Sequence, residues 1–104
     1  MRRRTLNGYD IDGTIAGTTK PVAPYVLISG RTWAEVPEHP LPPLDPPPLA
    51  VAVRGVGAYG DVQAAGEFKA TMINLWQVDT FYDDDPNQIA IINQRCPGCK
   101  TIQV

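Results

Sequence analysis

The chain has 104 residues, which is enough for one domain with a modest hydrophobic core. Its hydrophobic fraction of 43% and charged fraction of 19% are typical of a soluble globular protein. The net charge of −2 argues against a large nucleic-acid interface, because neutralising phosphates requires clustered Lys and Arg side chains. The only basic run, Arg2-Arg3-Arg4, is predicted to be a solvated tail.

Membrane and secretion signals are missing from the sequence. No apolar run approaches the roughly 20 residues that a membrane-spanning helix requires, and the N-terminus lacks the apolar stretch of a signal peptide. We therefore expect a cytoplasmic protein without membrane contacts, in which Cys96 and Cys99 are reduced.

Five short apolar runs are predicted to be strands, over residues 6–10, 25–28, 49–53, 78–82 and 100–104. The first is a weak strand former, because Asn7 and Gly8 disfavour extended structure. Asn7-Gly8 is also compatible with a hairpin turn, but the only sequence upstream is the arginine-rich tail, which offers no partner strand.

Two helices are predicted between the later strands. The first covers residues 67–75 and buries one face, formed by Phe68, Met72, Ile73 and Leu75. The second begins at Pro86, since proline suits the first turn of a helix, and stops at Pro97-Gly98. A single helical turn is predicted from Thr32 to Glu35, and residues 16–24 and 55–66 are predicted to be loops.

Most of the 11 prolines lie in residues 36–48. Proline denies both helix and strand, so this segment is predicted to be an exposed, polyproline-like connector. Docking of the segment in an aromatic-lined groove of a partner is the alternative role.

Strands that alternate with loops or helices predict a single α/β domain over residues 1–104, built on a mostly parallel sheet. In such sheets ligands bind at the carboxyl ends of the strands, near the point where the winding reverses. Polar residues follow the predicted strand ends: Asp10 and Asp12, Ser29 and Arg31, Arg54, and Asp83 to Asp85. We therefore expect a functional site at this edge of the sheet.

Asp10-Ile11-Asp12-Gly13-Thr14 places two carboxylates one residue apart. Two acids so close repel each other unless a cation, a proton or nearby amide dipoles offset the charge. Together with one of Asp83 to Asp85 they would suit Mg²⁺, which prefers oxygen ligands and sites that also bind phosphate. An acidic turn without a metal is one alternative. An EF-hand loop is another, but Pro21 stands where the bidentate Glu should be.

Ser29 and Lys69 carry little weight alone, because a serine at a strand end is usually a turn residue and a lone lysine on a helix is usually solvated. In the order found here, however, four segments resemble the motifs of haloacid-dehalogenase-type (HAD-like) phosphohydrolases. They are Asp10-x-Asp12-Gly13-Thr14, the strand ending in Ser29-Gly30-Arg31, Lys69, and the strand ending in Asp83-Asp84-Asp85.

The resemblance implies a Rossmann-like, doubly wound sheet of about five parallel strands with helices on both faces. It also implies a Mg²⁺-dependent phosphatase in which Asp10 is the nucleophile and Asp12 the general acid/base. The metal would be held by the Asp10 carboxylate, the main-chain carbonyl of Asp12, Asp84 and, directly or through its outer shell, Asp83. The substrate phosphate would contact Ser29, Gly30, Arg31 and Lys69, and Ser29 and Lys69 would also assist catalysis.

The loops over residues 16–24 and 55–66 are too short for the cap domains that many members of this family carry. An uncapped site would admit large phosphorylated substrates, including a nucleotide or a nucleic-acid end, as in a polynucleotide 3′-phosphatase. A homo-oligomer could complete so open a site. Two other functions are compatible with the sequence: a non-catalytic module that engages a partner through the proline-rich segment, and a phosphotransferase.

Cys96-Pro97-Gly98-Cys99 has the spacing of half a structural zinc site. His39 is the only histidine, and no second cysteine pair exists. A helix-ending turn with incidental thiols is therefore favoured over a metal or redox role.

Overall fold

A computed structural model describes residues 5–17, 19–38, 40–41, 43–58 and 60–104. The basic run Arg2-Arg3-Arg4, His39 and Pro42 of the proline-rich segment lie outside these residues. Within the described ranges, no helix is both long and apolar enough to cross a membrane.

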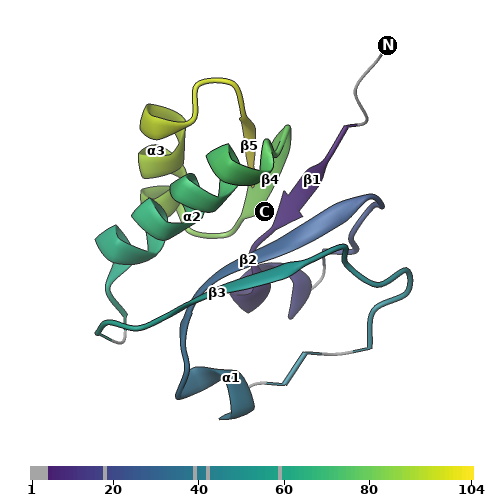
Figure 1. The fold of residues 1–104 in the computed structure, drawn as a ribbon, viewed down its shortest axis with the longest axis vertical. Coiled ribbons are helices and arrows are strands. Elements are labelled where there is room, and N and C mark those ends of the chain that lie inside the picture. Colours follow the sequence, from purple (N-terminus) through teal and green to yellow (C-terminus); the bar gives the residue numbers. More distant parts are fainter. Residues whose placement is uncertain (1–4, 18, 39, 42, 59) are drawn as a thin grey trace.

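The described strands form one five-stranded sheet in which every neighbouring pair is parallel (Figure 1). The strands are β1 (Asn7–Tyr9), β2 (Tyr25–Thr32), β3 (Val51–Gly55), β4 (Thr80–Asp83) and β5 (Lys100–Gln103), in the spatial order β3-β2-β1-β4-β5. The prediction of an α/β fold on a parallel sheet of about five strands is confirmed. The chain builds outward from β1 to β3, then returns to the other side of β1, so the winding reverses at β1. Such a reversal opens a crevice at the carboxyl ends of the central strands.

β1 is a strand despite the two residues that weaken it. It pairs in parallel with both β2 and β4, so the hairpin alternative at Asn7-Gly8 is wrong. A Cβ added to Gly8 would lie 2.8 Å from Cδ1 of Phe81 and 2.9 Å from Cγ1 of Val78. Glycine at this position therefore lets apolar side chains pack directly on the backbone of the central strand.

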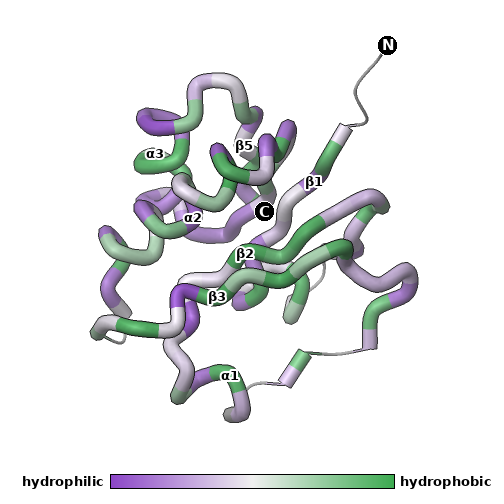
Figure 2. The backbone as a smooth tube through the Cα atoms, in the orientation of Figure 1, coloured by the Kyte–Doolittle hydropathy of each residue, from purple (hydrophilic) through white to green (hydrophobic). Residues whose placement is uncertain are grey.

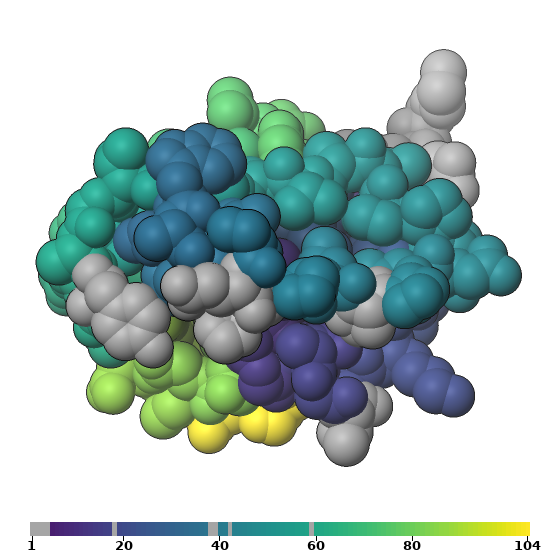
Figure 3. Space-filling model, turned by 90° about the horizontal axis from the view of Figure 1, so that it is seen from below, coloured from purple at the N-terminus to yellow at the C-terminus, as the bar shows by residue number. Residues whose placement is uncertain are grey.

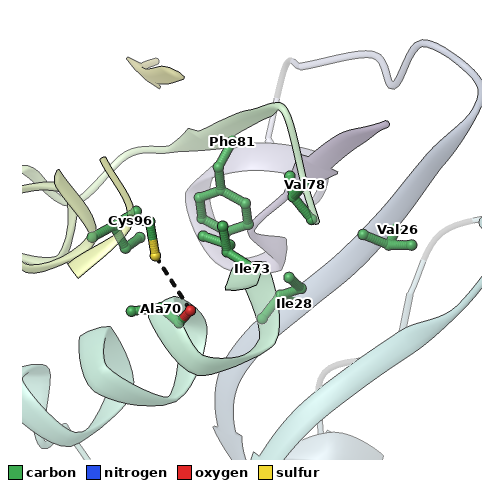
Figure 4. Close-up of a cluster of buried hydrophobic side chains, with 8 residues drawn as sticks. Val26, Ile28, Ala70, Ile73, Val78, Phe81 and Cys96 are labelled. Carbon is green, nitrogen blue, oxygen red and sulfur yellow. Dashed lines mark hydrogen bonds between the residues drawn. The ribbon is translucent and has the colours of Figure 1, made fainter. Parts of the chain in front are cut away.

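Two long helices, α2 (Val62–Trp76) and α3 (Pro86–Arg95), pack together against one face of the sheet (Figure 1). The first half of β2 is apolar (Figure 2) and supplies part of this core through Val26 and Ile28. Figure 4 shows the buried side chains that meet there, with the Cys96 thiol donating to the Ala70 carbonyl oxygen at 3.3 Å. This packing fixes α2 above the central strands.

The opposite face is covered by irregular segments. Tyr25 and Leu27 point to it, because successive strand residues alternate between the two faces. A short coil, η1 (Ile11–Ile15), and Leu44 from the proline-rich segment pack on these side chains, and the Tyr25 hydroxyl donates to the Pro46 carbonyl at 2.6 Å. In the described residues these segments occupy the face where the resemblance implied helices. The backbone of η1 is non-helical at Asp12 and Gly13, and in the proline-rich segment proline lacks the N–H that a helix requires.

α2 begins at Val62, well before the predicted start at residue 67, and thus takes up part of the predicted loop. The Asp61 side chain caps it by accepting from the Ala64 N–H at 2.9 Å. The prediction that Leu75 is buried is wrong, since Leu75 is 69% exposed. Lys69 lies on the buried face of α2 instead.

The end of β2 also differs from the prediction. The strand continues to Thr32, and the short helix α1 (Glu35–Glu38) starts only at Glu35. The spacing of Thr32 and Glu35 still matters, because the N–H and hydroxyl of Thr32 both donate to Oε1 of Glu35 at 2.9 Å. β3 likewise begins at Val51, two residues after the predicted start at residue 49.

Candidate active site

Asp10 and Asp83 lie side by side at the carboxyl ends of β1 and β4. The Asp10 N–H donates to the Tyr82 carbonyl at 2.9 Å, which extends the ladder between the two strands by one step. Phe81 points toward α2, so Asp83, two residues further along β4, points the same way. The same alternation directs Asp10 toward α2.

Lys69 of α2 meets both carboxylates. Its Nζ lies 2.9 Å from Oδ1 of Asp10 and 2.8 Å from Oδ2 of Asp83. The side chain of Lys69 is 2% exposed, that of Asp83 is 0% exposed and that of Asp10 is 7% exposed. A buried ammonium needs such partners, because an unpaired charge in this environment would be strongly destabilising.

Asp84 brings a third carboxylate to the same place from the solvent side. We call Asp10, Asp83 and Asp84 the carboxylate cluster. Gly13 leaves room for it: its φ is +74°, and a Cβ at this position would collide with the Asp84 carboxylate. The glycine of the first motif is thus needed both for the backbone turn and for the approach of Asp84.

The pKa values of the cluster reflect its burial and its excess of acids. Burial raises the pKa of Asp10 to about 7; Lys69 opposes this increase and Asp83 adds to it. Burial, and then Asp83, also raises the pKa of Asp84. Burial would lower the pKa of Lys69, but Asp10 and Asp83 more than offset it, so that this pKa is raised. Three carboxylates around one ammonium leave a site that attracts further positive charge.

The cluster fits a hard divalent cation. Each of the three residues can offer one oxygen, and these oxygens lie within 4.8 Å of one another. Ligand distances of about 2.0 to 2.6 Å would let one ion bridge such oxygens. Both oxygens of Asp83 already accept hydrogen bonds, from Lys69 and from the Asp85 N–H at 3.1 Å. Asp10 and Asp84 are therefore the more available direct ligands.

Asp12 lies apart from the cluster and pairs with Arg31. Its two carboxylate oxygens accept from Nε of Arg31 at 3.0 Å and from a terminal guanidinium nitrogen at 2.8 Å. Asp12 is 57% exposed, whereas Arg31 is 5% exposed. Such a two-point ion pair fixes the orientation of both groups.

Ser29 and Gly30 mark the end of the apolar part of β2. Ser29 is 1% exposed, and its hydroxyl accepts from the Arg31 N–H at 3.2 Å. A Cβ on Gly30 would lie 2.6 Å from that of Ala65, so glycine lets α2 approach β2 at this point. Ser29 is thus placed to order the last part of β2, where the pairing with β3 shifts register, while Gly30 lines the pocket.

A pocket of about 660 Å³ opens at this edge of the sheet. Of the residues expected to form the site, its walls include Asp10, Asp12, Gly30, Arg31, Lys69 and Asp84. Ser29 and Asp83 are not among the lining residues. Figure 3 shows part of this end of the molecule, where η1 (purple), the end of β2 with α1 (blue) and the start of α3 (light green) lie at the surface.

Three other lining residues were not among the predicted site residues: Glu35, predicted only to end a helical turn, Arg54, predicted only to follow a strand, and Asp61. Nε of Arg54 donates to the Gly30 carbonyl at 3.1 Å, and its terminal nitrogens donate to the carbonyls of Val56 and Ala58 at 2.7 and 2.9 Å. Arg54 thus ties the end of β2 to the loop that follows β3. Its position at a predicted strand end was the only available signal.

Comparisons with protein-family models, with curated proteins and with solved structures gave no match for this chain. The chemistry of the site is therefore inferred from its own residues.

Proposed function

We propose that this protein is an uncapped, HAD-like, Mg²⁺-dependent phosphatase that hydrolyses phosphomonoesters through an aspartyl-phosphate on Asp10. The observation that carries the proposal is the carboxylate cluster with its buried lysine, at the point where the winding of a parallel sheet reverses. Acidic turns on protein surfaces are usually solvated, whereas Asp10, Asp83 and Lys69 are all buried.

Asp10 and Asp84 would hold the metal, with Asp83 as a further ligand or an outer-shell partner and the main-chain carbonyl of Asp12 as the fourth group. When bound, Mg²⁺ supplies positive charge that draws electron density from the phosphoryl oxygens and lets an anionic carboxylate approach phosphorus. The raised pKa of Asp10 supports this assignment, because the buried acid needs a cation to remain ionised at neutral pH.

In the first step an Asp10 oxygen forms a bond to phosphorus while the bond from phosphorus to the ester oxygen breaks. Asp12 gives its proton to the departing oxygen. In the second step water attacks phosphorus, the bond to Asp10 breaks, and the proton of the water passes to Asp12. The products are the alcohol and inorganic phosphate.

The other residues bind and orient the substrate. Lys69 holds Asp10 in place and offsets the charge of the phosphate. Gly30 and Arg31, near the end of β2, receive the phosphate oxygens, and Ser29 supports them from beneath the pocket surface. Arg31 turns from Asp12 toward the phosphate when substrate enters, and the exposed Asp12 carboxylate then takes up a proton from solvent, which it donates to the leaving oxygen. The substrate is a phosphorylated small molecule, a nucleotide or a nucleic-acid end. The open pocket does not limit the size of the substrate.

The test is release of phosphate from an aryl phosphate with Mg²⁺ or with EDTA, in the parent chain, Asp10→Asn and the exposed control Asp45→Asn. We expect Mg²⁺-dependent turnover in the parent and the control and none in Asp10→Asn. Borohydride reduction during turnover should trap the acyl phosphate as a modified residue at position 10. Full activity of a folded Asp10→Asn protein, or trapping at another residue, would contradict the covalent mechanism.

A further inference from the structure

One exposed tryptophan, Trp33, lies in the chain between residues that line the pocket. Trp33 is 64% exposed, although tryptophan is a residue that proteins usually bury to a large extent. It follows the end of β2 and lies between Arg31 and Glu35 in the chain, and both of these residues line the pocket. No part of the proposed hydrolysis uses this side chain.

The position of Trp33 is fixed by the neighbouring strand. The main-chain N–H of Trp33 donates to the Gly55 carbonyl at 2.8 Å. Its indole lies against Gly55, where an added Cβ would be 2.7 Å from both Cε2 and Nε1 of the ring. Gly55 directly follows Arg54, another lining residue. The ring is thus held against the backbone of Gly55, next in the chain to residues that line the pocket, while most of its surface remains exposed.

The pocket is larger than a phosphate group requires. Its volume of about 660 Å³ falls in the range of about 300 to 1,000 Å³ that accommodates whole organic ligands. The phosphate end belongs at the carboxylate cluster, so the rest of the pocket and its rim receive the leaving group. The pocket is also lined by the acids Glu35 and Asp61, which disfavour additional anionic groups near them, and by the cation Arg54.

We propose that Trp33 is a specificity-determining residue that stacks on the nucleobase of a phosphorylated nucleoside. Every nucleobase has an apolar face that stacks on an aromatic side chain, so such a contact selects nucleosides without selecting one base. The placement of the phosphate rests on the proposed function, whereas the stacking contact can be measured without catalysis. The shared chemistry is a nucleoside with one terminal phosphate, either free or at the end of an oligonucleotide.

The binding test uses the fluorescence of Trp33 in a Trp76→Phe background, so that it is the only tryptophan. Excitation at about 295 nm avoids most nucleobase absorption. Adenosine monophosphate should quench the emission saturably, while glycerol phosphate and inorganic phosphate should not. The reverse variant, Trp33→Phe, keeps Trp76 and should give no response. Equal responses to adenosine monophosphate and glycerol phosphate, or no response to any nucleotide, would overturn the proposal.

The kinetic test compares the kcat/KM for adenosine monophosphate with that for glycerol phosphate. This ratio should fall about tenfold in Trp33→Ala, which is the scale of losing one base stack, and change little in Trp33→Phe. Leu75→Ala, which removes a similarly exposed side chain from α2, should leave the ratio unchanged. A fall in both rates with an unchanged ratio would indicate a structural role and overturn the proposal.

The outcomes separate the two proposals. Quenching without any phosphatase activity would sustain the stacking contact and contradict the proposed function. Phosphatase activity with an unchanged specificity ratio in Trp33→Ala would support the proposed function and contradict the stacking contact. A terminally phosphorylated dinucleotide, added as a competitor to the quenching assay, identifies the source: stronger competition than the mononucleotide points to a chain end, and weaker competition to a free nucleotide.

Discussion

Nζ of Lys69 lies 2.9 Å from Oδ1 of Asp10, although the two residues are 59 positions apart in the chain. The same nitrogen lies 2.8 Å from Oδ2 of Asp83. One buried ammonium therefore joins the ends of two strands to the middle of a helix, and the stability of the fold and the charge of the site depend on the same three groups.

Replacing Lys69 with Met should destabilise the protein strongly. The substitution leaves two buried carboxylates without their cation, and breaking a buried ion pair in this way costs about 3 to 5 kcal/mol. Urea unfolding of Lys69→Met and of Lys100→Met, whose lysine is exposed, gives the comparison. A difference within about 0.5 kcal/mol, the range of ordinary surface substitutions, would show that the pair contributes little.

The stability of the metal-free protein should fall as pH rises from about 4 to about 7. The folded state raises the pKa of Asp10 to about 7, whereas an unfolded aspartate titrates near 3.9. Between these values the folded protein holds a proton that the unfolded chain has lost, so increasing pH favours unfolding. The raised pKa of Asp84 acts in the same direction.

Unfolding free energies measured in EDTA across this range test the effect, which should be on the order of a few kcal/mol. The slope should shrink in Asp10→Asn, because the substituted side chain does not titrate. Stability that rises with pH over the window would mean that Lys69 keeps Asp10 ionised throughout.

Mg²⁺ should stabilise the folded protein through Asp84. A ligand at 100 times its dissociation constant adds about 2.7 kcal/mol, which would appear as an increase in Tm of several degrees. Asp84→Asn should lose most of this increase, while Asp45→Asn, at an exposed position in the proline-rich segment, should retain it. An equal Mg²⁺ response in both variants would place the metal elsewhere.

Gly13→Ala should weaken metal binding more than it weakens the fold. Gly13 has a φ of +74°, and a Cβ there would meet the Asp84 carboxylate. Gly60 has a nearly identical φ of +73° but no atom within 4 Å of an added Cβ, so Gly60→Ala shares only the backbone strain. We expect comparable losses of about 1 kcal/mol in unfolding free energy from the left-handed backbone in both variants, and loss of the Mg²⁺-dependent increase in Tm only in Gly13→Ala. If Gly13→Ala retains the Mg²⁺-dependent increase in Tm, then displacing the Asp84 carboxylate does not affect metal binding.

Both cysteines should be poor nucleophiles in the folded protein. Burial raises the pKa of Cys96, and burial followed by the neighbouring Cys96 and Asp79 raises that of Cys99 to about 11. Since the thiolate is the reactive form, alkylation by iodoacetamide at pH 8 should be much slower than in urea, as followed by mass spectrometry. Alkylation at the rate of the unfolded chain would contradict the burial of the Cys96–Cys99 turn.

Local sequence patterns were sufficient to predict the order of the strands along the chain, because a buried strand and an amphipathic helix have different apolar periods. They also placed Asp10 and Asp83 at strand ends, since the apolar runs stop there, whereas β2 continues three residues beyond Ser29. They failed at the start of α2, where residues predicted to be a loop form the first turns of a helix capped by Asp61. They also failed at Leu75, because the buried face of α2 is set by the position of the sheet.

The sequence by itself therefore determined a parallel α/β domain with acids at one edge, through the spacing of apolar residues along the backbone. Only the tertiary structure decided which charges meet. It buried Lys69 between Asp10 and Asp83, paired Asp12 with Arg31, and left Trp33 exposed against Gly55. These contacts join residues that are distant in the chain, and their energies depend on burial and on the number of carboxylates that share each cation, which local spacing does not encode.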